Sequence, residues 1–352
     1  MATRRGFLNT WLAAAMAPAA RAAKTIAEDD PGNIKLTHRV SARVTDDDLA
    51  FLQQIGLRWA RVEFGAGEGS FEDLQRARER FARFGMRIFT AVHQSYRSLK
   101  VQLGQPGRDE DIATYCRFLG DLGRLGIPAA SYDFHPANTY TTSMVQRRGY
   151  TAREFDEAVF RAKVEKQRFD REYTAAQIWS NYEYFMRAAL PAAEKAGVRL
   201  ALHPDDPPLA RMNGVAKLFT HYDGYRRAEQ IAGNSRYWGL TFCVGTWAEG
   251  GARMGKDVFE MIRDFGGRGK LFEVHFRNVT APLPRFVETF PDDGYLDMHR
   301  VMRTLREVKF DGAAEPDHVP RLAGDQGIYR AGTAYCIATM RAMLRRANEE
   351  VG

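Results

Sequence analysis

Residues Arg199–Pro208, with the sequence RLALHPDDPP, join a short apolar strand to side chains that bind cations. His203 follows the strand directly, and Asp205 and Asp206 lie between prolines. A proline-rich segment does not continue as a helix, so the strand is predicted to end in a rigid turn with its polar groups at a fixed place. Taken alone, this pattern fits a structural histidine equally well. Its meaning depends on the residues at the ends of the other strands.

Polar side chains also stand at the ends of the other apolar runs, and six of the eight histidines of the chain are among them. In a barrel of parallel strands these ends surround one axis, which is where active sites form. For each residue alone, a structural role is the commoner explanation. For the whole set of polar residues at the strand ends, a shared site is the better explanation. The residues are His38, Glu63, His93, Asp133, His135, His203, Cys243, His275, Arg277, Asp317 and His318.

Four of these residues, one from each of the last four strands, have the right chemistry for a metal site: His203, Cys243, His275 and Asp317. Two imidazoles, a thiolate and a carboxylate suit a divalent transition ion such as Mn²⁺, Fe²⁺, Co²⁺ or Zn²⁺. Cys243 by itself would fit a small buried strand residue. Arg277 lies two residues after His275, on the same face of an extended strand, where a guanidinium would clamp an anion.

Strand and helix patterns alternate along the whole chain, and eight strand–helix units predict a (β/α)8 TIM barrel, with a doubly wound sheet as the alternative. The predicted strands are 34–39, 59–64, 87–93, 127–134, 198–203, 237–245, 271–279 and 312–318. The predicted helices include 46–55, 71–84, 112–125, 173–196, 256–265 and 297–308. The segment 136–172, inserted after strand four, is long and polar and could cover the barrel mouth.

Residues 1–23 form a region of their own, in which Arg4 and Arg5 precede a short apolar stretch and a small-residue run. This pattern predicts a twin-arginine export signal and a periplasmic or otherwise exported protein, with residues 24–352 as the catalytic barrel domain. A basic N-terminus without a signal is the alternative. The apolar stretch is too short to span a membrane.

The mature domain carries only a mild positive charge, because removal of three arginines lowers the net charge from +7 to +4. The basic residues do not cluster, so nucleic acid is not expected as a partner. Three cysteines without CxxC spacing do not predict a disulfide framework. The oligomeric state is not indicated.

In five segments the chain resembles the mannonate dehydratase family of the xylose-isomerase-like TIM barrels. The segments are 201–208 (ALHPDDPP), 239–246 (GLTFCVGT), 274–279 (VHFRNV), 286–289 (FVET) with 296–298 (LDM), and 316–318 (PDH). The resemblance implies one divalent metal, usually Mn²⁺ with Fe²⁺ or Co²⁺ as alternatives, on His203, Cys243, His275 and Asp317. It also implies a small sugar acid as substrate, with dehydration of D-mannonate to 2-keto-3-deoxy-D-gluconate.

Within that reaction His318 is expected to transfer a proton, with Tyr329 as the second candidate. Arg277 is expected to hold the substrate carboxylate, and Asp205 and His135 to face the substrate. The chain departs from the family pattern at Val287, where a histidine is usual, and after His318, where glycine is usual. A sugar isomerase or epimerase on the same barrel, or a non-catalytic exported sugar-binding protein, would share many of these residues.

Overall fold

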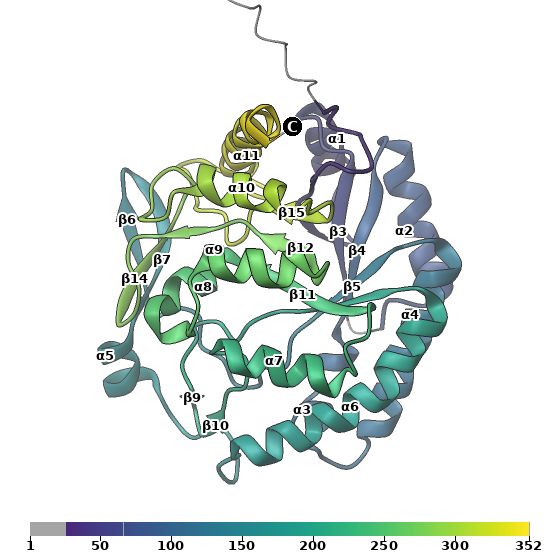
Figure 1. Cartoon of the computed structure of the whole chain (residues 1–352), viewed down its shortest axis with the longest axis vertical. Helices are drawn as coiled ribbons and strands as arrows, with labels where there is room; N and C mark the ends of the chain where they lie inside the picture. Colours follow the sequence, from purple (N-terminus) through teal and green to yellow (C-terminus); the bar gives the residue numbers. More distant parts are fainter. Residues whose placement is uncertain (1–25, 66, 352) are drawn as a thin grey trace, which may run out of the picture.

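The computed structural model describes residues 26–65 and 67–351, so the predicted export signal at residues 1–23 lies outside the described residues. A nine-stranded parallel sheet curls around the centre of the molecule (Figure 1). Its strands, in spatial order, are β1 (Lys35–Leu36), β15 (Ala313–Glu315), β12 (Leu271–His275), β11 (Trp238–Cys243), β8 (Arg199–Leu202), β5 (Ala129–Tyr132), β4 (Arg87–His93), β3 (Trp59–Phe64) and β2 (Arg39–Ser41).

The two edge strands of this sheet are pieces of one segment, the first predicted strand, which is interrupted only at Thr37 and His38. β1 pairs with β15, and β2 pairs with β3, both in parallel. The first strand therefore joins both edges of the curled sheet. All eight predicted strand positions are occupied by strands, and the predicted TIM-barrel class is confirmed.

Helices cover the outside of the sheet in the alternating order that the sequence predicts. They are α1 (Asp46–Gln54), α2 (Phe71–Arg83), α4 (Arg108–Leu125), α6 (Ala175–Ala196), α7 (Tyr222–Ile231), α9 (Val258–Met261) with the π-helical η4 (Ile262–Gly266), α10 (Met298–Glu307) and α11 (Arg330–Val351). The shorter helices within the connections are η1 (Gln94–Arg97), α3 (Leu99–Leu103), α5 (Glu157–Val159), η2 (Phe160–Val164), α8 (Val244–Gly250) and η3 (Gly251–Met254).

Local sequence sets several helix boundaries. Thr174 and Gln177 form a reciprocal capping box at the start of α6, and Gly197 ends this helix in the left-handed conformation, with φ of 70°. Among the described residues, no helix combines the length and apolar character needed to cross a membrane. The apolar core lies between the strands and these helices, and its buried members include Val62, Leu200 and Ile337.

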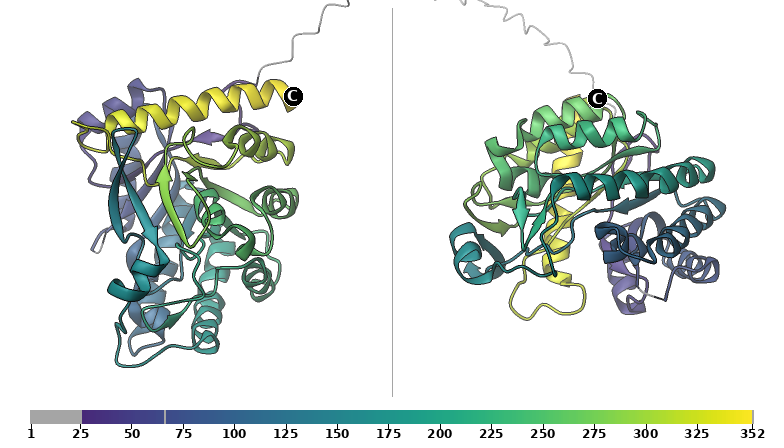
Figure 2. Two further views of the ribbon diagram at one scale, coloured as in Figure 1. Left: turned by 90° about the vertical axis from the view of Figure 1, so that its left-hand side faces the viewer. Right: turned by 90° about the horizontal axis from the view of Figure 1, so that it is seen from below.

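The inserted segment 136–172 contributes two strands to a second, antiparallel sheet. Its strands β6 (Ser143–Arg147) and β7 (Tyr150–Asp156) make an antiparallel hairpin, and β7 pairs with β14 (Arg285–Thr289), which pairs with β13 (Asn278–Val279). In the left view of Figure 2 the hairpin and β14 run side by side along one flank of the barrel. A short ribbon, β9 (Arg211–Met212) with β10 (Val215–Ala216), lies in the connection after β8.

Candidate active site

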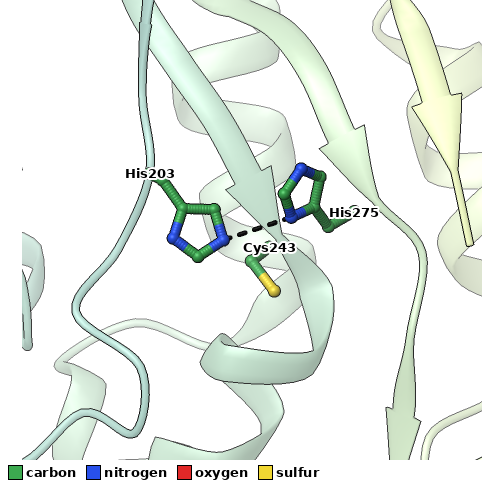
Figure 3. Close-up of side chains that lie close together, drawn as sticks. All are labelled: His203, Cys243 and His275. Atoms are coloured by element: carbon green, nitrogen blue, oxygen red, sulfur yellow. Dashed lines mark hydrogen bonds between the residues drawn. The ribbon is translucent and has the colours of Figure 1, made fainter. Parts of the chain in front are cut away.

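The four predicted metal ligands meet at the carboxyl ends of the strands. His203 follows β8, Cys243 and His275 are the last residues of β11 and β12, and Asp317 follows β15. One donor atom from each of His203, Cys243 and His275 lies within 4.8 Å of the others (Figure 3). Asp317 Oδ2 lies 3.8 Å from His275 Nδ1 and 3.9 Å from Cys243 Sγ. The structure thus brings the predicted set together in one cluster, in which His203 is half-buried and the other three residues are buried.

The two imidazoles of this cluster turn their lone pairs toward each other. His203 Nδ1 lies 2.8 Å from the carbonyl oxygen of Pro204, and His275 Nε2 lies 3.1 Å from Glu315 Oε1. Since only an N–H group is stable beside such oxygens, the remaining nitrogens, His203 Nε2 and His275 Nδ1, present lone pairs. These two atoms are 3.1 Å apart, so a proton or a cation must lie between them.

The charges around the cluster also favour a proton or a cation between the two imidazoles. Burial, with the nearby rings of His275 and His135, lowers the pKa of His203 well below its ordinary range, so this ring is neutral. Burial alone would lower the pKa of His275, but Asp317, Cys243 and Glu315 together raise it to about 10. Burial also opposes ionisation of Asp317, yet His318, His275 and Arg277 hold its pKa well below the usual value. A divalent cation would replace the proton between the rings, so the residues present fit a transition-metal ion.

Asp205 and Asp206 have different roles despite their adjacency. Asp205 is fully buried, and its Oδ2 accepts hydrogen bonds from the backbone N–H groups of Leu218 and Phe219, at 3.1 Å and 3.0 Å. It fixes the turn on which His203 stands and does not line the cavity at the barrel mouth. Asp206 does line that cavity, so the predicted place of Asp205 at the substrate is corrected in favour of Asp206.

The predicted role of Arg277 as the clamp of the substrate carboxylate is also corrected, because its side chain is completely buried and surrounded by carboxylates of the protein. Its guanidinium contacts Glu249, lies 2.8 Å from Asp206 and 2.9 Å from Glu288, and approaches Asp317 Oδ2 to 3.2 Å. A guanidinium with this many partners has no free edge for a substrate carboxylate. Arg277 instead holds the ligand Asp317 and the cavity residue Asp206 in place.

A cavity of about 460 Å³ opens above the ligand cluster, and we refer to it as the inner cavity. Four arginines line it, and the sequence pattern assigned none of them to the site: Arg39, Arg61, Arg97 and Arg153. Arg39 is the last residue of the first predicted strand, 34–39. The search for polar side chains at strand ends, which singled out His38, could therefore have included Arg39. Arg97 and Arg153 belong to the connection after β4 and to the inserted hairpin, where the sequence carries no such signal.

His135 and His318 also line the inner cavity, from opposite positions in the ring of strands. His135 Nε2 lies 2.9 Å from Asp133 Oδ1 and 3.2 Å from the Tyr140 hydroxyl. His318 Nδ1 lies 2.9 Å from Glu288 Oε1, and the His318 backbone is left-handed, with φ of 49°. Such backbone strain is commonly stored at functional sites. Tyr140, from the inserted segment, lies between the two histidines, with ring centroids 5.9 Å and 6.2 Å away.

Tyr329, like Asp205, is a predicted site residue that does not line the inner cavity. Its side chain is 43% exposed, and it lines a second cavity, of about 820 Å³, that we call the outer cavity. Its predicted catalytic role therefore finds no geometric support here.

Comparison with known proteins places this site in a family. The sequence model of the D-mannonate dehydratase (UxuA) family matches residues 52–349, which include all four predicted ligands. This chain belongs to the D-mannonate dehydratase family. Similar proteins include the mannonate dehydratase of Streptococcus pneumoniae (strain 70585), 30% identical over 71% of this chain and 76% of its relative. The mannonate dehydratase 2 of Halalkalibacterium halodurans is 28% identical over 64% of this chain and 72% of that protein.

The fold comparison agrees with the family assignment. The mannonate dehydratase of Streptococcus suis serotype 2 superimposes with a TM-score of 0.78 at 26% identity, covering 90% of this chain and 96% of the other. An L-ribulose 3-epimerase gives a TM-score of 0.60 at 12% identity over 90% and 96% of the two chains, a likeness of fold alone.

The two departures of this dehydratase-family chain from the family pattern fall in one place. Val287 and Val319 both pack against an apolar cluster of Tyr150, Ala152, Phe290 and Cys336. Val319 and Ala152 also line the outer cavity. The departures therefore alter the wall beside the outer cavity and leave the metal ligands unchanged.

Proposed function

We propose that this protein dehydrates D-mannonate to 2-keto-3-deoxy-D-gluconate with a divalent transition metal, Mn²⁺ before Fe²⁺ or Co²⁺. The observation that carries the proposal is the convergence of His203, Cys243, His275 and Asp317 at the mouth of a family-typical barrel. These four residues would hold the ion. When bound, it supplies Lewis-acid stabilisation of the negative charge that develops beside the substrate carboxylate.

The inner cavity offers separate groups for the two proton transfers. Glu288 holds the Nδ1–H of His318, which leaves the Nε2 lone pair free to take the proton from C2 of the acid. Burial, with the carboxylates of Asp133 and Asp206, raises the pKa of Tyr140, so its hydroxyl keeps a proton. Tyr140, whose hydroxyl lies 3.2 Å from His135 Nε2, gives this proton to the hydroxyl that leaves C3 as water. The resulting enol then takes its keto form.

Arg39 combines weak pairing with closeness to the metal ligand Asp317, and we assign it to the substrate carboxylate. The arginine predicted for this task, Arg277, is saturated by buried carboxylates, and Arg97 lies 2.7 Å from Asp133. In the part of the chain that the structure describes, Asp317 is the one carboxylate within 4.0 Å of the Arg39 guanidinium, at 3.8 Å, and the Arg39 side chain is 36% exposed. A guanidinium this weakly paired can bind a carboxylate with both edges.

The direct test is incubation of the Mn²⁺-loaded protein with D-mannonate and other hexonates, with the product identified by mass. A 2-keto-3-deoxy acid, lighter than its substrate by one water, is expected. A product of unchanged mass would instead indicate an isomerase or epimerase. Tight binding with no turnover would indicate a sugar-binding protein. His203→Ala should abolish turnover, whereas His299→Ala, which removes a half-buried histidine of α10 that lines neither cavity, should not.

We also propose that the protein is exported by the twin-arginine route. The support is the order of residues at the N-terminus, with Arg4 and Arg5 before an apolar and then a small-residue stretch. Replacing both arginines by lysine should keep the protein in the cytoplasm. Unchanged export of this variant, measured by cell fractionation, would refute the proposal.

A further inference from the structure

The outer cavity adjoins the metal site but extends well beyond it. Arg39, Arg153 and His318 line both cavities, so the two spaces meet along these side chains. The outer cavity lies between the inserted hairpin, the end of the first strand segment and the loop 316–329. It is the larger of the two, at about 820 Å³ against 460 Å³.

A single sugar acid does not need this space. Cavities of roughly 300–1,000 Å³ hold ligands of drug size. The inner cavity alone falls in this range, and a hexonate is small for it. The outer cavity therefore offers room for a further part of a substrate whose reacting end lies at the metal ligands.

The lining of the outer cavity is positively charged. Within residues 26–65 and 67–351, no carboxylate oxygen lies within 4.0 Å of the side-chain nitrogens of Arg153 or Arg321. Within these same residues, the Arg39 guanidinium has one carboxylate partner, Asp317, at 3.8 Å. The carboxylate in this lining, Glu63, is 3.3 Å from Arg61. Three arginines with so little internal compensation favour an anionic ligand.

The same cavity carries apolar groups that are unusual on a surface. Tyr329 is 43% exposed and Met144 is 57% exposed, and both line it. Gln146 and Thr151, from the inserted hairpin, add hydrogen-bonding groups. An exposed aromatic ring beside polar and charged groups suits a ring-shaped polar ligand, such as a pyranose, better than a simple inorganic anion.

We propose that the outer cavity is a second subsite, which binds an acidic sugar unit attached to the sugar acid at the metal ligands. This proposal rests on the proposed dehydratase function. The preferred substrate would be a disaccharide acid in which a uronic acid is linked to O4, O5 or O6 of a hexonate. The reaction removes the proton from C2 and the hydroxyl from C3 as one water, and the glycosidic bond stays intact. Arg321 and Arg153 would bind the carboxylate of the second unit, and Tyr329 its ring.

The test compares three substrates with the Mn²⁺-loaded enzyme: D-mannonate, a uronosyl-D-mannonate, and the hexosyl-D-mannonate of the same linkage, which lacks the second carboxylate. We expect kcat/KM for the uronosyl acid to exceed that for D-mannonate by about tenfold or more. Arg321→Gln should remove about tenfold of this advantage and leave D-mannonate turnover unchanged, since Arg321 lines only the outer cavity. Arg345→Gln, on the exposed face of α11, is the matched control and should change neither value.

Turnover of D-mannonate without turnover of either disaccharide acid would overturn the subsite while leaving the dehydratase function intact. An equal preference for the hexosyl and uronosyl acids would overturn the acidic character of the unit. If no acid is dehydrated, the proposed function fails, and calorimetry still tests the subsite. In that measurement the wild type should bind the uronosyl acid about tenfold more tightly than Arg321→Gln, and equal affinities would overturn the subsite.

Discussion

Glu315 fixes the orientation of the ligand His275, and its replacement by glutamine should weaken metal binding. Glu315 is fully buried at the end of β15, and its Oε1 lies 3.1 Å from His275 Nε2. Glutamine keeps the size of the side chain but removes the charge that holds the proton on Nε2. The ring is then free to change its tautomer or its orientation, and Nδ1 no longer presents a fixed lone pair.

The expected loss is set by the kind of contact that is removed. Removal of a group that orients a metal ligand costs about 10–100-fold in metal affinity. We therefore expect the dissociation constant for Mn²⁺ to rise by about 10–100-fold, or ~1.4–2.7 kcal/mol. Titration calorimetry of the metal-free proteins with Mn²⁺ measures this change directly.

Glu273→Gln is the matched control for Glu315→Gln. Glu273 is equally buried, and both carboxylates contact Arg61, Glu273 at 3.5 Å and Glu315 at 3.4 Å. Glu273 Oε2, however, accepts a hydrogen bond from Thr241 at 3.0 Å. Both variants should lose stability in urea, but Glu315→Gln should lose considerably more Mn²⁺ affinity. Equal affinities for the wild type and Glu315→Gln, or an equal loss in both variants, would refute the reasoning.

Three further predictions concern other parts of the site. Arg277→Met leaves several buried carboxylates without their partner and should lower the free energy of unfolding by about 3–5 kcal/mol in urea titrations. If Arg277 instead held the substrate carboxylate, the same substitution would raise KM and leave the stability unchanged. His38 is buried, and burial lowers its pKa from 6.5 to about 4, so the folded state binds fewer protons than the unfolded chain and stability falls as the pH is lowered from 6.5 to 4. His38→Asn should remove up to about 3 kcal/mol of this fall, and an unchanged pH profile of the unfolding free energy would count against it. His318→Asn should lower kcat for D-mannonate by about 10²–10⁴-fold in steady-state assays, and Tyr329→Phe should lower it far less; the reverse order would restore Tyr329 as the catalytic residue.

The sequence predicts the frame of the site well because strand ends are a property of local pattern. A histidine, a cysteine or an aspartate directly after an apolar run is carried to the barrel mouth by the parallel topology, so the four ligands could be named in advance. The same pattern placed Arg277 next to the substrate, but it could not show which side chains surround that guanidinium. Glu249, Asp206 and Glu288 reach Arg277 from other elements, and such charge pairing is decided by tertiary packing.

The inserted segment shows a second limit of sequence reasoning. Its length and polar composition indicated a segment that could cover the barrel mouth, but they did not indicate that β7 pairs with β14, with Phe155 opposite Phe286. Antiparallel pairing between segments so distant in the chain leaves no mark on the local pattern of either one. As a result, the contributions of Tyr140 to the inner cavity and of Arg153 to both cavities could be found only in three dimensions.

The divided first strand has a consequence for the order in which this molecule can be assembled. Lys35 pairs with Ala313, so a residue that is synthesised early cannot pair until a residue almost 280 positions later in the chain has been synthesised. Until β15 has been synthesised, both edges of the sheet stay open, and Arg39 cannot come near Asp317. Ring closure and completion of the metal site are therefore one event, and a nascent chain that stops short of residue 313 has neither.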